Sequence, residues 1–315
     1  MAELFGDFLL VKRLARGAWS ELWLAQPRYA EGVGHVVIKR LLPAMARRKD
    51  AIAMLEGEGR LASRLDHRHV VTSSAALVTD NGDWYLVQPH IRGTNLGKLL
   101  AYAAQVQVAL PLQLRVYIAA SAAHGISHAH SRHNPADGQH MAIIHRDLTP
   151  ANLLVGLDGI VKITDFGIAR GRGRKKLTSI GQVRGTLAYM APEQAAGTKI
   201  DHRVDIYALG VVIWELLAGR RLYPDLPDFS VLSRIANEVP EAPSTFDDEV
   251  DSDLDAFVHR CLQKRPEDRF QSAADVCELL YDWLDDDVPT LQAALATWLA
   301  ELAKNKRGQM TTLNT

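Results

Sequence analysis

The hydrophobic pattern of this chain changes near residue 93, and that change constrains the fold more than any other feature. Before residue 93, short β-branched or aromatic runs predict strands at 8–14, 22–25, 35–41, 77–79 and 84–88, around one helix at 45–65. After it, helical spacing dominates and predicts helices at 96–104, 112–131, 201–218, 230–237, 251–263 and 272–284. A strand-rich small lobe followed by a helical large lobe is an α+β arrangement, and the crevice between two lobes is a natural ligand site.

The pattern divides the chain into a small lobe at 1–90, a large lobe at 91–284 and a C-terminal segment at 285–315. The C-terminal segment carries an apolar stripe at helical spacing, formed by Leu291, Leu295, Trp298, Leu299 and Leu302. Two interpretations remain open: the stripe packs on the large lobe, or it docks a partner protein. The residues after this helix are predicted to form a disordered tail.

Composition sets the limits within which a function must lie. The net charge is -1, so nothing global favours nucleic acid as a partner. The apolar run at 206–219 is interrupted by Glu215 and is shorter than the ~20 residues of a membrane span, so we interpret it as a buried helix. No signal-peptide pattern opens the chain, and Cys261 and Cys277 have no metal-binding spacing. The expectation is a cytoplasmic protein with reduced thiols.

Five short motifs occur in a fixed order along the chain. They are LARGAWSEL at 14–22, VVIK at 36–39, HRDLTPAN at 145–152, DFG at 165–167 and APE at 191–193. Together they resemble the protein kinase family over about residues 8–282. The residues in and around the later motifs are similar to those of the bacterial eukaryotic-like Ser/Thr branch. The resemblance implies a two-lobe kinase fold, with a small antiparallel-sheet lobe, one main helix in that lobe, and a nucleotide site between the lobes.

The resemblance also implies a place for the nucleotide phosphates. Lys39 occupies the strand position that contacts the α- and β-phosphates of ATP in the family, and it needs a carboxylate partner. Glu58 and Glu56 are the candidates on the following helix. They point about 200° apart, so only one can face the lysine. Glu58 is preferred, because it lies nine residues before His67, as the spacing in the family requires.

The catalytic assignments follow from the third and fourth motifs. The resemblance gives Asp147 the task of orienting the substrate hydroxyl and accepting its proton, and gives Asn152 and Asp165 the task of holding Mg²⁺ through oxygen atoms. Thr149 is a departure, because most Ser/Thr kinases carry at this position a lysine that neutralises the γ-phosphate. His145 and Phe166 are predicted to pack in the core of the lobe.

The remaining nucleotide contacts are assigned by position in the family. The glycine loop keeps only its middle glycine, Gly17, although small residues at the flanking positions still allow the backbone to approach phosphates. Pro89 offers a carbonyl group and Ile91 an amide group to the adenine. The other predicted contacts of the nucleotide are Leu14, Ala15, Ser20, Leu22, Val37 and Leu154.

The segment from 165 to 193 resembles a kinase activation segment. Arg146 next to the catalytic aspartate is typical of kinases that are controlled by phosphorylation, and Thr178 or Ser179 is the predicted phosphorylation site. Thr186 is expected to bond to Asp147. Two structural pairings are also predicted: an ion pair of Glu193 with Arg269, and backbone amides of the catalytic loop bonded to Asp205.

The leading interpretation is a Ser/Thr protein kinase that uses ATP and Mg²⁺ on protein substrates. A pseudokinase scaffold is the first alternative, motivated by Ala15, Ser20 and Thr149. A small-molecule kinase is the second, and the APE motif argues against it. A zinc site at His128, His130 and His133 is weighed against a plain helix end, where histidines lie near the C-terminal dipole, and the helix end is preferred.

Overall fold

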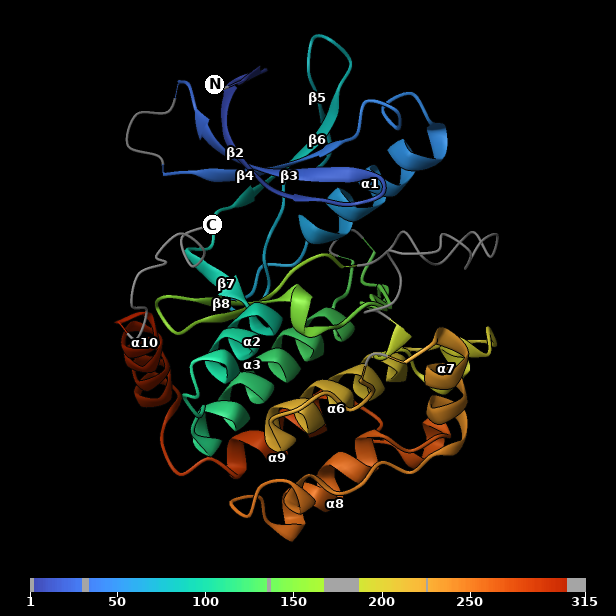
Figure 1. Cartoon of the computed structure of the whole chain (residues 1–315). Coiled ribbons are helices and arrows are strands. Elements are labelled where there is room, and N and C mark those ends of the chain that lie inside the picture. The colour runs from blue at the N-terminus through green and yellow to red at the C-terminus, as the bar shows by residue number, and fades with distance from the viewer. Residues whose placement is uncertain (1–2, 30–33, 135–136, 167–186, 225, 305–315) are drawn as a thin grey trace.

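The computed structural model describes residues 3–29, 34–134, 137–166, 187–224 and 226–304. Figure 1 shows a small lobe built mainly of strands above a larger lobe built mainly of helices. The α+β two-lobe fold predicted from the sequence is therefore confirmed. None of the helices in the described part of the chain is both long and apolar enough to cross a bilayer.

The small lobe is an antiparallel sheet with one helix packed on it. In order across the sheet the strands are β1 (Glu3–Phe5), β2 (Phe8–Arg16), β3 (Ser20–Pro27), β4 (Val36–Leu41), β6 (Trp84–Pro89) and β5 (Leu77–Val78). The helix α1 (Lys49–Ala62) contacts β4 and β6. A turn at Asn81 and Gly82 joins β5 to β6: Gly82 has a φ of 83°, and its amide donates to the carbonyl of Thr79 at 2.9 Å.

The large lobe is organised around two buried helices. Nearly every residue of α6 (Arg203–Ala218) and most residues of α3 (Leu112–His130) are buried, and the two helices pack on each other. The apolar run at 206–219 is thus a buried helix, as predicted, and it ends at Gly219 with a φ of 65°. The surrounding helices are α2 (Leu96–Gln105), α5 (Pro192–Ala195), α7 (Asp228–Asn237), α8 (Ser252–Cys261) and α9 (Ala273–Asp282).

A second sheet lies at the top of the large lobe, where the sequence predicted helices and loops only. Its strands, in order, are β7 (Gly93–Asn95), β8 (Leu153–Gly156) and β9 (Val161–Ile163). Each has three or four residues, and β8 and β9 are largely buried, so no alternation of polar and apolar residues marks them. The strand β8 begins directly after the HRDLTPAN motif, and β9 ends two residues before Asp165.

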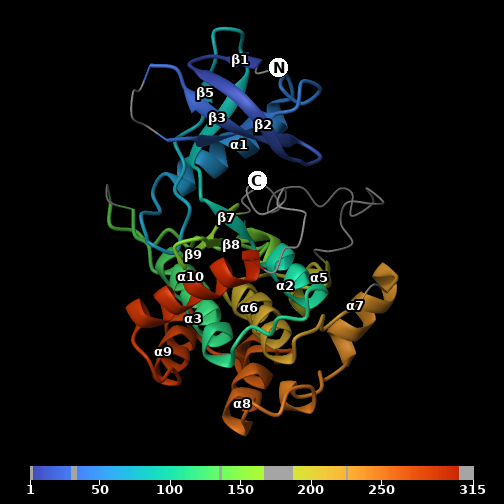
Figure 2. The same cartoon turned by 60° about the vertical axis from the view of Figure 1, so that its left-hand side comes forward.

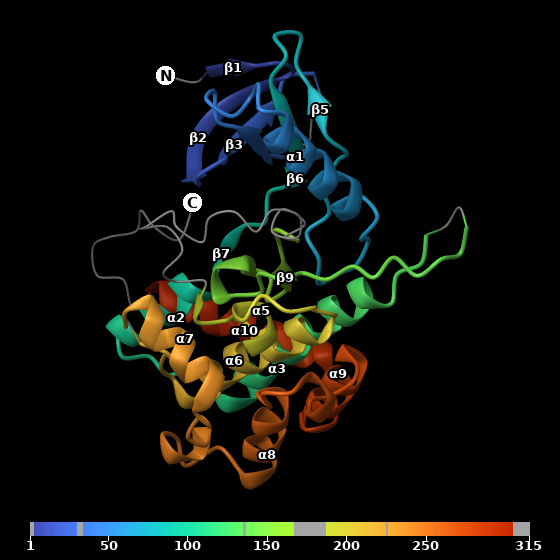
Figure 3. The same ribbon diagram turned by 90° about the vertical axis from the view of Figure 1, so that its right-hand side faces the viewer.

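A short ribbon of chain follows α3. Asn134 donates its amide to the carbonyl of Gln139 at 2.8 Å, and the residues at 133 and 140 form an isolated antiparallel bridge. Figure 3 shows this ribbon projecting from the large lobe. Gly138, with a φ of 70°, also donates its amide to the carbonyl of Asn134 at 2.8 Å, as suits a turn-forming residue.

The C-terminal helix α10 (Val288–Lys304) packs on the large lobe (Figure 2). It contacts α3, and its apolar stripe is buried, with the exposed fraction of Leu295 at 0% and that of Trp298 at 8%. The indole Nε1 of Trp298 donates to the carbonyl of Ala109 at 3.0 Å. The packing interpretation is confirmed, and the apolar stripe is covered by the chain itself. The predicted tail at 305–315 lies outside the described residues.

Candidate active site

Lys39 lies at the centre of the site, with two carboxylates bonded to its ammonium group. Its Nζ is 2.6 Å from Oε1 of Glu58 on α1 and 2.7 Å from Oδ1 of Asp165, which lies 126 residues further along the chain. The side chains of Lys39 and Glu58 are only 13% and 14% exposed. The lysine–carboxylate pair predicted from the sequence is therefore present, and Glu58 rather than Glu56 forms it.

The close packing of α1 on the sheet explains why Glu58 reaches the lysine. Gly59 has no side chain, and a Cβ atom at this position would lie 2.6 Å from Leu86 and 2.9 Å from the amide nitrogen of Ala76. Leu86 pairs directly with Lys39 across β6 and β4. The glycine thus lets the helix approach the strand that neighbours the lysine, and the adjacent glutamate faces the ammonium group.

The electrostatics keep Lys39 charged. Burial acts to lower its pKa, but the carboxylates of Asp165 and Glu58 outweigh burial and raise the pKa above its usual value. The same ammonium group lowers the pKa of Asp165 despite burial of that carboxyl. Burial prevails at Glu58 and raises its pKa, although Lys39 opposes this effect. The site therefore combines a permanent cation with carboxylates held close to it.

Asp205, at the start of α6, holds the catalytic loop in shape. Its carboxylate accepts the backbone amides of His145 and Arg146, each at 2.7 Å, as the sequence predicted. The ring Nε2 of His130 lies 2.9 Å from the same carboxylate, a contact that no sequence signal indicated. These hydrogen bonds lower the pKa of the buried Asp205, so it is a charged acceptor at neutral pH.

Asp147 and Asn152 come together within this loop. The side-chain amide of Asn152 donates to the backbone carbonyl of Asp147 at 2.8 Å, and a single turn of 3₁₀ helix at Pro150–Asn152 brings the two residues close. This bond uses the amide nitrogen of Asn152, so the oxygen of the side chain is the atom available to a metal ion. Thr149 precedes the turn and is 7% exposed.

The DFG segment joins the loop to the lysine. Asp165 has a φ of 59°, a left-handed conformation that is uncommon for residues other than glycine. Phe166 is buried, and its ring lies 4.7 Å from that of His145, whose Nε2 is 3.0 Å from the carbonyl oxygen of Thr164. Both aromatic residues are therefore packing residues, as predicted, and they support the backbone that turns Asp165 toward Lys39.

The predicted nucleotide contacts lie around this centre. Leu22 pairs with Lys39 across β3 and β4, so both side chains point to the same face of the sheet, and Val37 shares that face. Leu154 lies on β8 in the large lobe and is half-buried. In the glycine loop, the amide of Gly17 donates to the carbonyl of Ser20 at 2.8 Å, which closes a tight turn. Of the other predicted contacts, Leu14 and Ala15 lie on β2, Pro89 is the last residue of β6, and Ile91 follows that strand.

The donor atoms fit a magnesium nucleotide. Asp165 and Asn152 supply a carboxylate and a carboxamide oxygen, the hard ligands that Mg²⁺ prefers. Lys39 supplies a fixed positive charge for phosphate oxygens. Leu22, Val37 and Leu154 are the side chains that would offer apolar faces to a flat base. Among the described residues, no group of three or more His, Cys, Asp or Glu side chains is arranged to hold a metal ion by itself.

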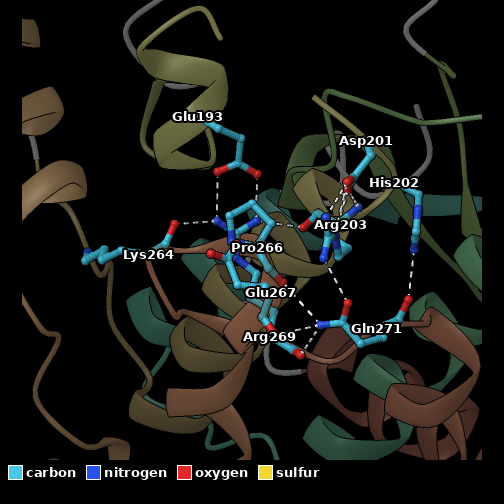
Figure 4. Close-up of polar contacts among 9 residues, drawn as sticks. All are labelled: Glu193, Asp201, His202, Arg203, Lys264, Pro266, Glu267, Arg269 and Gln271. Carbon is cyan, nitrogen blue, oxygen red and sulfur yellow. Dashed lines mark hydrogen bonds and ion pairs between the residues drawn. The ribbon is translucent and has the colours of Figure 1, made fainter. Parts of the chain in front are cut away.

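The predicted ion pair of Glu193 and Arg269 is present (Figure 4). Two parallel hydrogen bonds of 2.7 and 2.8 Å join the groups, and the guanidinium also donates to the backbone carbonyls of Gln263, Arg203 and Lys264. This pair ties the short helix α5 to the segment before α9. A neighbouring contact was not predicted: Gln194 donates its side-chain amide to the carbonyl of Arg146 at 2.8 Å.

The regulatory assignments cannot all be placed. Thr178, Ser179 and Thr186 lie outside the described residues. Arg146 is described and has a φ of 66°, and its Nε is buried without a hydrogen-bond partner among the described residues. Their part in regulation stays a prediction.

Comparison with known proteins agrees with this geometry. The tyrosine-protein kinase MasK of Myxococcus xanthus is 35% identical over 285 residues, which cover 90% of this chain and 44% of MasK. The serine/threonine-protein kinase PknA of Corynebacterium glutamicum is 34% identical over 275 residues, which cover 86% of this chain and 55% of PknA. This chain thus spans about half the length of these relatives.

A solved structure and a family model complete the comparison. The kinase domain of Mycobacterium tuberculosis PknI superposes with a TM-score of 0.66, covers 89% of this chain and 98% of its own, and is 25% identical. The family model described as protein kinase domain matches residues 11–281. The chain therefore belongs to the protein kinase family, in its bacterial eukaryotic-like branch.

Proposed function

We propose that this chain is a Ser/Thr protein kinase that transfers the γ-phosphate of Mg-ATP to hydroxyl groups of protein substrates. The observation that carries the proposal is the convergence of Lys39, Glu58 and Asp165 within 2.7 Å contacts, beside the loop of Asp147 and Asn152. Phosphoryl transfer needs little more from a protein than positioned charges and an oriented hydroxyl. This set of groups provides both.

The chain's own residues divide the work among them. Lys39, held by Glu58, would bind the nucleotide phosphates, and Asn152 and Asp165 would hold Mg²⁺ through oxygen atoms. Bound Mg²⁺ supplies positive charge that offsets the charge on the phosphate oxygens. Asp147 would orient the substrate hydroxyl and accept its proton as the new O–P bond forms. The terminal phosphorus–oxygen bond of ATP breaks, and ADP leaves with the electron pair.

The preference for serine and threonine rests on relatives and on the sequence. PknA and PknH are named as serine/threonine-protein kinases, whereas MasK is named as a tyrosine-protein kinase. The stretch from Gly185 to Glu193 resembles the Ser/Thr branch, which favours hydroxyls of Ser and Thr. Phosphoamino-acid analysis of the labelled product tests this point, and phosphotyrosine as the main product would contradict it.

A cytoplasmic location is part of the same proposal. ATP is a cytoplasmic substrate, and Cys261 and Cys277 are both buried free thiols, which suits a reducing compartment. Phosphorylation of Thr178 or Ser179 by the protein itself is the proposed control. Mass spectrometry of protein prepared with and without ATP tests it, and the absence of added phosphate at both positions would contradict it.

The rival is a pseudokinase, which Thr149 motivates because it brings no positive charge near the γ-phosphate. The decisive experiment is transfer of radiolabelled phosphate from ATP to the protein itself or to a generic basic protein. Asp147→Asn is the matched variant, because it keeps the size of the side chain and removes the proton acceptor. We expect transfer by the native protein and loss of about 10²–10⁴-fold in the variant. No transfer by either protein would favour the pseudokinase.

A further inference from the structure

Four of the 12 histidines pack together where the segment after α1 meets the large lobe. His67 and His69 belong to that segment, and His124 and His128 belong to α3. The ring centroid of His67 lies 4.5 Å from that of His124 and 4.6 Å from that of His128. The ring of His69 lies 5.5 Å from the rings of both His67 and His124. We call these four residues the histidine cluster.

The hydrogen bonds of His67 and His69 disfavour a second proton on either ring. His69 is 1% exposed, and its Nδ1 lies 2.8 Å from the carbonyl oxygen of Val161, so Nδ1 carries the proton. Its Nε2 is buried without a hydrogen-bond partner among the described residues. In His67 the Nδ1 atom accepts the backbone amide of His69 at 3.2 Å. Protonating either ring therefore breaks a hydrogen bond or buries an N–H group without an acceptor.

The charges around the cluster also disfavour protonation. Arg68 lies within the segment, Lys162 on β9 and Arg132 just beyond α3, and each acts to lower the pKa of at least one of the rings. The carboxylate of Asp66 opposes this effect at His128. From α9, the neutral Tyr281 faces His124 with ring centroids 6.0 Å apart.

Burial and the neighbouring cations act in the same direction, whereas the carbonyl of Val161 opposes them at His69 and Asp66 opposes them at His128. Burial is the largest cause, and it lowers the pKa of all four histidines. The pKa falls to about 4 at both His67 and His69. At neutral pH the cluster is therefore a set of uncharged rings.

The histidine cluster lies between the two elements that position the partners of Lys39, which are Glu58 and Asp165. The segment carrying His67 and His69 continues from α1, which holds Glu58. It is bonded to β9: Val71 donates its amide to Ile163, and Ile163 donates its amide to His69, at 2.8 and 2.9 Å. Asp165 follows β9 by two residues. Figure 3 shows this segment descending from α1 to the large lobe beside β9.

The backbone of α3 at Gly125 lies directly against the backbone of the segment at His69. A Cβ atom on Gly125 of α3 would lie 2.7 Å from the carbonyl oxygen of His69 and 2.8 Å from Cδ1 of Ile163. The helix therefore touches the segment without an intervening side chain. Because the ring of His69 is fully buried in this close-packed space, we expect a charge on it to displace the segment as well as side chains.

We propose that the histidine cluster is a proton-sensitive junction, closed at neutral pH and opened by acidification, which couples pH to the alignment of α1 with β9. Histidines in an unfolded chain take up protons near pH ~6.5. The folded cluster takes them up only at lower pH. Stability from the closed junction is therefore complete above about pH 6.5 and is lost as the pH falls from there toward about 4.

The first test compares the native protein with a double variant, His67→Asn with His69→Asn. Asparagine places an oxygen or an N–H group near the position of Nδ1, so both hydrogen bonds can be kept while the titrating groups are removed. His259→Asn is the control, because His259 is exposed on α8. The measurement is the equilibrium constant of unfolding in urea at pH 7.5 and pH 5.5.

Between pH 7.5 and pH 5.5, the unfolding constant of the native protein should rise about a hundredfold more than that of the double variant. Each of the two histidines contributes about tenfold to this difference. The control should follow the native protein. Equal pH dependence in the native protein and the double variant would overturn the proposal.

A second measurement uses the native protein, so it tests the proposal even if the double variant does not fold. The imidazole carbon resonances of the histidines report the protonation of each ring during a pH titration. We expect at least two histidines to stay neutral down to about pH 5. Hydrogen exchange of the amides at 67–71, corrected for its intrinsic pH dependence, should then accelerate at lower pH. Titration of every histidine near pH ~6.5 would overturn the proposal.

Discussion

Lys39 illustrates how much of this molecule depends on single side chains. One ammonium group contacts two carboxylates, at 2.6 and 2.7 Å, and all three side chains are at least 70% buried. Such a group of charges is costly to bury unless each member keeps its partner. The trio has one negative charge more than positive, which suits a site that must also accept a divalent cation.

The choice between Glu58 and Glu56 gives a sharp prediction at the residue scale. Glu58→Gln removes the charge that fixes the ammonium group, so the lysine is misplaced and phosphate transfer should fall about 10²-fold. Glu56→Gln is the matched control on the same helix and should keep the native rate. Initial rates with radiolabelled ATP measure both. Equal losses in the two variants would show that the contact with Lys39 is not what matters.

The buried ion pair of Arg269 with Glu193 gives a second prediction. The side chain of Arg269 is 0% exposed and that of Glu193 is 10% exposed. Arg269→Met leaves the carboxylate and three backbone carbonyls without their donor, so the free energy of unfolding should fall by about 3–5 kcal/mol. Arg265→Met, at an exposed pair with Asp268, should change it little. Urea unfolding measures both, and a similar small effect in the two variants would contradict the prediction.

At the scale of elements, α10 shows how a helix outside the matched family region is bound to the domain. The family model ends at residue 281, and α10 begins at Val288. Gln292 receives a hydrogen bond from Arg68 at 2.7 Å and donates one to the carbonyl of Asp158 at 3.0 Å. The helix therefore touches both the segment after α1 and the turn between β8 and β9.

Gly159 makes that contact possible and provides a test. It has a φ of 77°, and a Cβ atom there would lie 2.0 Å from the carbonyl oxygen of Gln292. Gly82 has a similar φ of 83° with nothing within 4 Å, so Gly82→Ala measures the backbone cost alone, about 1–2 kcal/mol. Gly159→Ala should cost a further ~1–3 kcal/mol, because α10 must shift.

The measurement is the free energy of unfolding of the two variants, together with limited proteolysis after residue 284. Faster cleavage at 285–304 in Gly159→Ala alone would show that α10 has been displaced. Equal free energies for the two variants would show that the contact with α10 contributes nothing.

At the scale of the whole molecule, the two lobes differ in how they are held together. The large lobe has one continuous buried core that runs from α2 to α10, whereas the small lobe has two separate small clusters of buried residues. The large lobe is therefore the rigid platform, and α6 at its centre carries the catalytic loop through Asp205.

That role of Asp205 leads to the fourth prediction. Asp205→Asn replaces one acceptor oxygen by an NH₂ group, so the amide of His145 or Arg146 loses its acceptor. The free energy of unfolding should fall by about 1–3 kcal/mol, and the amides of the loop should exchange faster with solvent. Asp201→Asn is the control, since its carboxylate is 42% exposed and bonds to Arg203. Unchanged exchange at 145–147 in Asp205→Asn would contradict the prediction.

Much of the site was predictable because its residues lie in short motifs. Lys39, Asp147, Asn152 and Asp165 each sit in a run that can be recognised from three to eight neighbouring residues. The ion pair of Glu193 and Arg269 followed from the same resemblance. The predicted ends of helices differ from the observed ends by a few residues: the helix predicted at 45–65 is α1, which spans Lys49–Ala62. The ends of a helix depend on local hydrogen bonds.

Other features had no local signal. The three short strands β7, β8 and β9 are too brief to show a period, and they exist because they pair with one another across about sixty residues of chain. His130 bonds to Asp205 from 75 residues away, and no pattern near either residue indicates the contact. The histidine cluster joins residues from two elements in the same manner.

The sequence by itself determined the class of the fold, the family and the residue types at the active site. These depend on local spacing and on motifs made of neighbouring residues, which can be recognised without a structure. The tertiary structure confirmed the glutamate that the spacing favoured, and it alone decided what covers the apolar stripe of α10 and which histidines meet. Those outcomes depend on how closely backbones approach at positions such as Gly59, Gly125 and Gly159, and such distances are set by packing in three dimensions.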